Sequence, residues 1–269
     1  MSLNRATRQA AEAWLAEGRT AVVVVVLETR GSAPRKAGTR MLVGASQTVG
    51  TVGGGHLELK AIEEARAMLG GAVPPHQVHY PLGPALGQCC GGAVTLGFTR
   101  LDAQQLAAWP DPPPRFHLQL YGAGHVGTAI ARLLSMLDVT VDWIDEREDM
   151  FPYALFEGAP WPSNIRVVAV DEVWGEVPAA PEGAYYLVLT HSHDLDLKIT
   201  ETILKRGDFG YLGLIGSETK RARFIHRFEA MGIPMQRIAR ITCPIGVEGI
   251  TAKEPEIIAL AVVAQLLQE

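Results

Sequence analysis

The chain contains two stretches with different hydrophobic patterns. In the first, an unbroken β-branched and apolar run over residues 20–29 is typical of a buried strand. An amphipathic helix is expected before this strand, and shorter strands and a second helix after it. The elements predicted here are helices at about 7–17 and 58–69 and strands at 20–29, 41–43, 48–52 and 94–98. This half is predicted to be a small α+β or α/β domain.

From residue 116 onward, apolar strands alternate with helical patterns. Such alternation predicts a parallel sheet with helices on its faces. The strands are expected at about 117–121, 139–145, 165–170, 185–190 and 211–215, and the helices near 125–137, 195–206, 217–231 and 255–268. The second half is therefore predicted to be an α/β domain.

A proline-rich segment separates the two stretches. Residues 110–114 contain four prolines in five positions, which no helix or central strand can accommodate. We predict an N-terminal domain over 1–108, an extended linker over 109–115 and a C-terminal domain over 116–269. The alternative interpretation is a long surface loop within a single domain.

Composition and charge exclude several classes of protein. Hydrophobic residues make up 48% of the chain and charged residues 20%, which is enough for a sizeable core and argues against disorder. The 24 basic and 29 acidic residues give a formal charge of −5, which argues against a general nucleic-acid binder. Apolar runs are too short to span a bilayer, and the three cysteines make neither a disulfide framework nor a four-ligand zinc site. We expect a soluble, cytoplasmic protein with no nucleic-acid or membrane partner.

A glycine-rich loop follows the first strand of the second half. Gly122, Gly124 and Gly127 form the pattern G-x-G-x-x-G between a strand and a helix, which predicts a Rossmann-like fold and an anion at the start of that helix. His125 lies within the loop. Asp145 follows Gly122 by 23 residues, near the spacing of a ribose-binding carboxylate; the alternative is a solvated carboxylate at a strand end.

Two further loops are predicted at strand ends of the same sheet. His191, His193 and Asp196 follow one strand and could bind a metal, orient a polar ligand or move protons, although a nearby acid could simply cap the next helix. Ser217, Lys220 and Arg221 follow the next strand and could cradle an anion. The alternative for this second group is a solvated basic face.

Two loops in the first half also have the composition of an anion site. The segment that contains Arg30, Ser32 and Arg35 is rich in cations, glycine and proline. Gly54 and Gly55 belong to a run of three glycines that could form a backbone nest for an anion or act as a flexible hinge.

Adjacent cysteines form the least common segment of the chain. Gln88, Cys89 and Cys90 lie between glycines, whereas buried structural cysteines usually occur singly among apolar residues. A reactive or ligand-contacting thiol is therefore favoured here. Cys243 is interpreted as structural.

Taken in order, these segments resemble the xanthine dehydrogenase accessory protein family, XdhC/CoxI. The resemblance covers nearly the whole chain and is carried by TRGSAPRKAGTRMLV, GTVGGGHLE, LGPALGQCCGG, YGAGHVG, THSHDLD, YLGLIGSETKRARF and CPIGVEGI followed by KEPEIIALAVVAQLL. It implies a carrier without turnover of its own, which binds molybdenum cofactor, protects it during sulfuration and delivers it to apo-xanthine dehydrogenase. A cysteine desulfurase-type sulfur donor is the second implied partner.

The resemblance also suggests roles for the candidate residues. Cys89 or Cys90 would contact the molybdenum side of the cofactor, since soft metals prefer thiolates. Arg30, Arg35 and the loop from Gly122 to Gly127 would hold its anionic end, with assistance from Lys220 and Arg221. Binding of a nucleotide at the Gly122 loop and formation of a homodimer are left open.

Two other classes of function compete with the carrier. The glycine loop and Asp145 also suit an NAD(P)-dependent oxidoreductase, for which His191 or His193 would supply the acid or base. A nucleotide-sensing interaction module would bind a nucleotide but no pterin.

Overall fold

The computed structural model describes residues 3–72, 77–82, 92–109, 113–152 and 162–269. The chain divides into two compact units, Ser2–Pro112 and Pro113–Glu269. Each unit has its own sheet and its own hydrophobic core.

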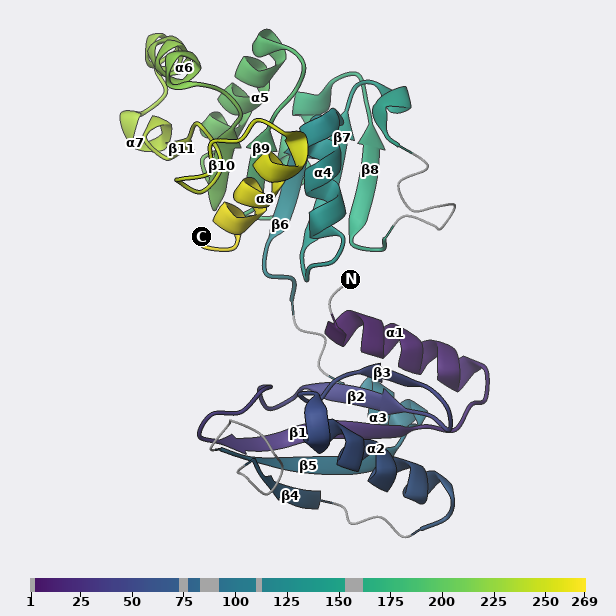
Figure 1. Cartoon of the computed structure of the whole chain (residues 1–269). Coiled ribbons are helices and arrows are strands. Elements are labelled where there is room, and N and C mark those ends of the chain that lie inside the picture. Colours follow the sequence, from purple (N-terminus) through teal and green to yellow (C-terminus); the bar gives the residue numbers. More distant parts are fainter. Residues whose placement is uncertain (1–2, 73–76, 83–91, 110–112, 153–161) are drawn as a thin grey trace. The chain divides into compact units, whose positions relative to one another are not determined.

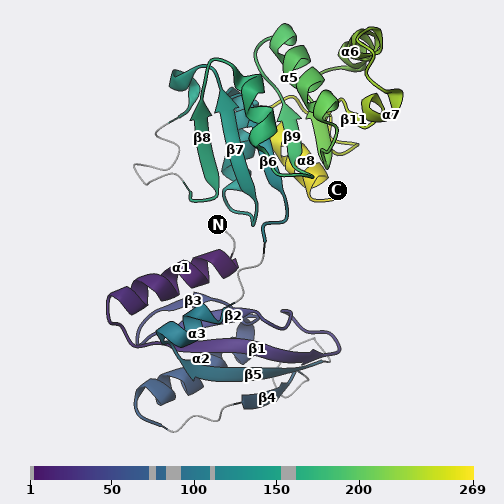
Figure 2. The ribbon, with the colours of Figure 1, turned by 180° about the vertical axis from the view of Figure 1, so that it is seen from behind.

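The first unit is an antiparallel sheet with helices on both faces (Figures 1 and 2). The strands lie in the order β3-β2-β1-β5-β4. They span Val22–Arg30 (β1), Arg40–Val43 (β2), Thr48–Gly50 (β3), Gln77–Pro81 (β4) and Ala93–Arg100 (β5), and the helices span Leu3–Ala16 (α1), Gly55–Leu69 (α2) and Ala103–Ala107 (α3).

The central strand β1 is apolar on both sides because helices cover both faces of the sheet. Val22 and Val24 pack with α2, whereas Val23 packs with α1 on the opposite face. Successive side chains of a strand point to opposite faces, so a strand that is covered twice needs an unbroken apolar run. The unbroken apolar run that predicted a buried strand is therefore explained by the helices that cover both faces of the sheet.

The second unit is a six-stranded parallel sheet with helices on both faces. The strands lie in the order β8-β7-β6-β9-β10-β11, which is the order of a dinucleotide-binding Rossmann sheet. They span His117–Tyr121 (β6), Thr140–Asp145 (β7), Ile165–Ala169 (β8), Tyr185–Val188 (β9), Tyr211–Leu214 (β10) and Ile241–Thr242 (β11). The helices span His125–Leu134 (α4), His193–Arg206 (α5), Glu218–Ala230 (α6), Met235–Ile238 (α7) and Pro255–Leu266 (α8), with short 3-10 segments at Glu148–Met150 (η2) and Val173–Ala179 (η3).

Two cores hold this sheet between its helices. α4 and α8 pack on one face, and α5, α6 and η3 pack on the other. The connection that follows β6 contains α4 and lies on one face, whereas the connection that leads into β9 contains η3 and lies on the other. β6 and β9 are neighbours in the sheet, although β7 and β8 separate them in the sequence. The carboxyl ends of these two strands flank the switch point where open parallel sheets bind ligands.

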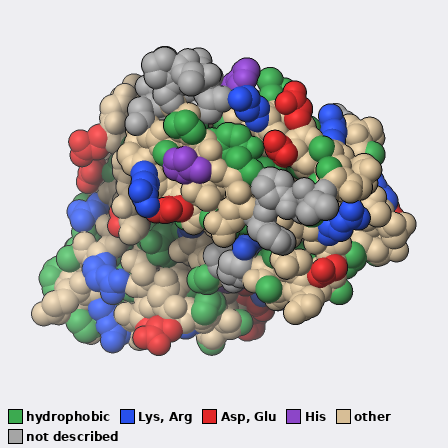
Figure 3. Space-filling model, turned by 90° about the horizontal axis from the view of Figure 1, so that it is seen from below, with side chains coloured by type: hydrophobic (Ala, Val, Ile, Leu, Met, Phe, Trp, Pro, Cys, Tyr) green, Lys and Arg blue, Asp and Glu red, His purple; other side chains and the backbone are tan. Residues whose placement is uncertain are grey.

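The predicted fold class is confirmed: a Rossmann-like parallel sheet in the second half and a mixed helix and strand domain in the first. The antiparallel sheet makes the first half α+β. Within the described residues, no helix is long and apolar enough to cross a membrane. On the face that Figure 3 presents, acidic and basic side chains are interspersed among hydrophobic ones, in keeping with the small net charge.

Candidate functional site

The carboxyl edge of the parallel sheet gathers four of the predicted segments. The loops after β6, β9 and β10 contribute the glycine turn, the His191 segment and the Ser217 segment, and Asp145 is the last residue of β7. Parallel strands bring their carboxyl ends to one edge, so these segments lie on the same side of the sheet. The fold thus brings together segments that are far apart in the sequence.

The three glycines of the loop after β6 have different structural roles. A Cβ on Gly122 would overlap the carbonyl of Leu189, and a Cβ on Gly127 would overlap the carbonyl of Gly122, so both positions are closed by backbone packing. A Cβ on Gly124 would meet no heavy atom within 4 Å. Gly124 is also the N-cap of α4 and has no side chain to satisfy the first helical N–H groups. The loop thus leaves partly exposed, open backbone at the positive end of α4, where an anion is favoured.

Asp145 is held inside the protein rather than presented to solvent. The residue is 4% exposed, and its Oδ2 accepts a hydrogen bond from the backbone N–H of Ala123 at 2.7 Å. Arg147 donates to both oxygens from its side chain and to Oδ1 from its backbone, each at 3.0 Å. Burial opposes ionisation, but these hydrogen bonds outweigh it and hold the pKa of Asp145 below its ordinary value. The carboxylate therefore stabilises the glycine loop through its hydrogen bond with Ala123.

A polar cavity of about 280 Å³ lies at the ends of β9 and β10. It is lined by Thr190, His191, His193, Asp196, Ile215, Gly216, Ser217 and Lys220. The structure thus brings together five residues that the sequence had placed in two separate candidate groups: two histidines, Asp196, Ser217 and Lys220. Arg221 does not line this cavity.

Asp196 and Lys220 form a buried ion pair in the wall of this cavity. Lys220 Nζ lies 2.5 Å from Asp196 Oδ2, and the two side chains are 10% and 2% exposed. Lys220 also donates to the carbonyl of Ile215 at 2.7 Å, and Asp196 Oδ1 accepts from the backbone and hydroxyl of Thr190. Lys220, which the sequence suggested as part of an anion cradle, is therefore paired with a carboxylate of the chain itself.

The two histidines of the cavity differ in their surroundings. His191 Nε2 lies 3.5 Å from Glu146 Oε1, which joins the loop after β9 to the loop after β7. His193 begins α5, whose N-cap is Ser192. No group of three or more metal-ligating side chains occurs within the described residues, so the two histidines have no further ligand there.

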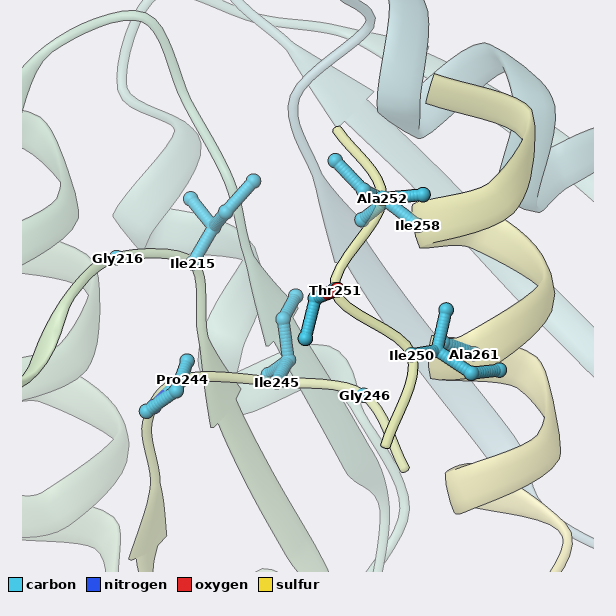
Figure 4. A pocket seen from close by; sticks show the side chains of 10 residues that line it. All are labelled: Ile215, Gly216, Pro244, Ile245, Gly246, Ile250, Thr251, Ala252, Ile258 and Ala261. Carbon is cyan, nitrogen blue, oxygen red and sulfur yellow. The ribbon is translucent and has the colours of Figure 1, made fainter. Parts of the chain in front are cut away.

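An apolar cavity of about 190 Å³ adjoins the polar one. Figure 4 shows that its walls come from the end of β10, from the loop after β11 and from α8. Ile215 and Gly216 line both cavities. A ligand at this edge would therefore meet polar groups on one side of Gly216 and isoleucines on the other.

In the first unit, Glu58 of α2 occupies the turn formed by the three glycines. One oxygen, Oε2, accepts from the backbone N–H groups of Val52 at 3.2 Å and Gly54 at 3.1 Å, and from the hydroxyl of Thr51. Gly53, Gly54 and Gly55 all have positive φ, which is the conformation of such a turn. The carboxylate of the chain itself thus takes a position that the nest hypothesis gave to a ligand.

The cation-rich loop after β1 packs against the other predicted segments of this unit. A Cβ on Gly53 would overlap Pro34, and a Cβ on Gly92 would overlap the backbone of Arg30 and Ser32. Arg30 pairs with Glu28 at 3.0 Å on the surface, and Ser32 and Arg35 are exposed. The fold therefore gathers the Arg30 loop and the glycine turn at one end of the sheet.

The described residues that flank the cysteine segment, Leu82 and Gly92, lie at this same end of the sheet. Leu82 and Gly92 are linked by a backbone hydrogen bond of 2.8 Å, and Ala93 pairs with Arg30 in the sheet. Gln88, Cys89 and Cys90 themselves lie outside the described residues. Cys243 is buried, and burial raises the pKa of its thiol, in keeping with a structural role.

Glu58 and Arg147 are among the residues of these sites that were not predicted from the sequence. Glu58 could have been found as an acid in the first turn of the helix that follows the glycine run, where the helix dipole favours it. Arg147 had no comparable signal, because only the folded loop turns its side chain back onto Asp145.

Comparisons with known proteins relate both halves of the chain to one family. Residues 118–266 match the model of the XdhC Rossmann domain, and residues 14–81 match that of the XdhC and CoxI family. The Escherichia coli K12 protein YqeB is 28% identical over 247 residues, which make up 90% of this chain and 42% of YqeB. This chain therefore spans less than half the length of that relative.

A solved structure has the same fold. The crystal structure of a Bacillus halodurans protein described as a xanthine dehydrogenase (BH1974) superposes with a TM-score of 0.78 at 19% identity. The match covers 98% of this chain and 95% of that one. At this identity the likeness shows a shared fold.

Proposed function

The chain belongs to the XdhC and CoxI family, and on this premise we propose that it serves the maturation of xanthine dehydrogenase. It binds the molybdenum cofactor, protects it while the terminal sulfur is installed, and delivers it to the apo-enzyme. The observation that carries this proposal is the open, partly exposed backbone at Gly124, which lies at the same sheet edge as a built polar cavity.

The residues present suit the chemistry of this cargo. The cofactor carries a phosphate, and the positive end of α4 with its exposed His125 is suited to hold one. Arg30, Ser32 and Arg35 offer further donors on the first unit. Cys89 or Cys90 would contact the metal side, because thiolates are soft ligands.

Two partners and an assembly belong to this proposal. Apo-xanthine dehydrogenase receives the cofactor, and a cysteine desulfurase-type protein supplies the sulfur. A homodimer stays a prediction. The protein is proposed to act without turnover of its own, so its activity would be read as transfer of cofactor to an acceptor.

The test uses protein purified from a host that synthesises molybdenum cofactor. Its pterin is oxidised and measured by fluorescence, and its molybdenum is measured by mass spectrometry. Pterin and molybdenum in equal amounts are expected, and the variant with Cys89→Ala and Cys90→Ala should lose both. A Cys243→Ala variant is the matched control and should keep both. Absence of both pterin and metal after incubation with free cofactor would refute the proposal.

A second candidate is an NAD(P)-dependent oxidoreductase or a module that senses a nucleotide. The Rossmann strand order and the position of Asp145 favour it. The four hydrogen bonds already made by Asp145 weigh against it, since a carboxylate has about four acceptor sites. Titration calorimetry with NAD+ and NADP+, combined with the pterin assay, distinguishes these candidates from the carrier, since they would bind a nucleotide but no pterin.

A further inference from the structure

Lys220 is the cation that lines the polar cavity at the ends of β9 and β10, and its Nζ also lies 5.4 Å from the centroid of the Phe224 ring. A lysine ammonium has three N–H donors. Within the described residues, Lys220 has two hydrogen-bond acceptors, Asp196 Oδ2 and the carbonyl of Ile215. Lys220 also lines the cavity, so the third donor is available to a group bound there.

The charges around this donor do not favour an anion. Asp196 lies 2.5 Å from Lys220 Nζ, so the two formal charges cancel at short range. Glu146 faces His191 across the same edge, and the first turns of α5 and α6 carry Asp194 and Glu218. Asp196 is the carboxylate in the lining of the cavity, and its pairing with Lys220 leaves a hydrogen-bond donor with little net charge. This donor suits an uncharged acceptor, such as a carbonyl oxygen.

The lining of the site suits a ring with one polar edge and one apolar face. A Cβ on Gly216 would lie 2.5 Å from Lys220 Cδ, so only glycine lets the lysine side chain lie across this position to reach Asp196. Gly216 and Ile215 form the boundary between the polar and the apolar cavity, as Figure 4 shows for the apolar side. A ring placed there would direct its carbonyl to Lys220 and one of its apolar surfaces to the isoleucines.

We propose that this cavity is the ring subsite of the ligand: it holds an uncharged, carbonyl-bearing ring through Lys220, and the anionic end of the ligand lies at α4 instead. This inference rests on the proposed function, under which the ring is the pterin of the cofactor. It replaces the anion cradle that the sequence suggested for Ser217 and Lys220 with a neutral recognition site. Lys220 is thereby a specificity residue, and Asp196 positions it.

The first test measures binding of molybdenum cofactor to the full chain as a function of salt. The variant with Asp196→Asn and Lys220→Met removes both charges and keeps an oxygen for Thr190. We expect its affinity to fall about tenfold, the scale of one hydrogen bond from a charged donor, with an unchanged dependence on salt. The matched control is Glu201→Gln with Lys205→Met, which removes an ion pair of 2.6 Å on the surface of α5 and should bind as the wild type does.

Two results of this test would overturn the inference. An unchanged affinity would show that Lys220 does not contact the ligand. A weaker dependence on salt, by about one charge, would show that Lys220 contacts an anionic group. If the wild type binds no cofactor at all, the proposed function itself has failed, and that result is distinct from both.

The second test uses the wild type and does not depend on how the variant folds. Pterin without a phosphate is the probe, and its binding is followed by fluorescence. It should compete with molybdenum cofactor, bind equally well at low and high salt, and resist displacement by inorganic phosphate. Displacement by inorganic phosphate, or tighter binding of nicotinamide mononucleotide than of pterin, would contradict the assignment.

Discussion

Arg147 encloses the carboxylate of Asp145: its Nε lies 3.0 Å from Oδ1 and its Nη2 lies 3.0 Å from Oδ2. With the backbone N–H groups of Ala123 and Arg147 added, all four acceptor sites of the carboxylate are used. A Rossmann sheet that binds NAD offers this carboxylate to the ribose hydroxyls. Here the same position stabilises the loop.

The first prediction concerns NAD+ affinity. Arg147→Ala frees two acceptor sites of Asp145, so NAD+ should bind this variant about tenfold more tightly than the wild type, as measured by titration calorimetry. Arg132→Ala, at an exposed position on α4, is the control and should have no effect. Tight NAD+ binding by the wild type would show instead that the ribose displaces Arg147.

The second prediction separates the glycines of the loop after β6. Gly127→Ala places a methyl group against the carbonyl of Gly122 and should lower the free energy of unfolding by about 2 kcal/mol or more, measured in urea. Gly124→Ala adds its methyl group in open space, so it should fold normally but bind cofactor more weakly. Equal stability of the two variants would contradict the packing described for Gly127.

The third prediction concerns the carboxylate in the glycine turn of the first unit. Glu58→Gln weakens three hydrogen bonds to one oxygen and should destabilise this unit by about 1–2 kcal/mol in urea denaturation. Glu63→Gln, at an exposed position on the same helix, should change stability by less than about 0.5 kcal/mol. A stable Glu58→Gln variant would mean that the turn does not depend on this carboxylate.

The fourth prediction is a pH dependence from Asp142. Burial opposes its ionisation, but hydrogen bonds from Arg166 and His117 outweigh burial and lower the pKa of Asp142. A lowered pKa stabilises the folded state above the unfolded value, about 3.9, and this contribution is lost as the pH falls through the folded value. The unfolding free energy of the wild type should therefore fall more steeply below about pH 4 than that of Asp142→Asn. Asp171→Asn, at an exposed position, is expected to keep the slope of the wild type.

The fifth prediction concerns the thiols. Burial raises the pKa of Cys243, so this thiol should be protonated and shielded in the folded protein. In the variant with Cys89→Ala and Cys90→Ala, a thiol reagent at pH 8 should react with Cys243 only after denaturant is added. Rapid reaction of the native variant would place Cys243 at the surface.

Much of the second unit could be predicted from its sequence because local signals agree there with the tertiary structure. Apolar strands, the helix starts near His125 and Glu218, and the glycine spacing all follow from short-range patterns. The two-residue strand β11 and the short helix α7 carry no such periodicity and were not predicted.

The first unit was less predictable, because its topology depends on pairing between distant strands. β4 over Gln77–Pro81 alternates only weakly and pairs with β5, which follows it by more than ten residues. The candidate site shows the same limit. The residue types were found from the sequence, but their partners were not, since Lys220 meets Asp196 across 24 residues and only in the folded sheet.

The hydrogen bond between Leu82 and Gly92 has a consequence for how this protein could diversify. The sheet holds Leu82 and Gly92 together, so the entropy of closing a longer connection between them is a small term. A doubling in length costs only about 0.6 kcal/mol. Loop-closure entropy therefore sets no strong limit on the number of residues between Leu82 and Gly92, and longer connections at this end of the sheet can evolve at little entropic cost.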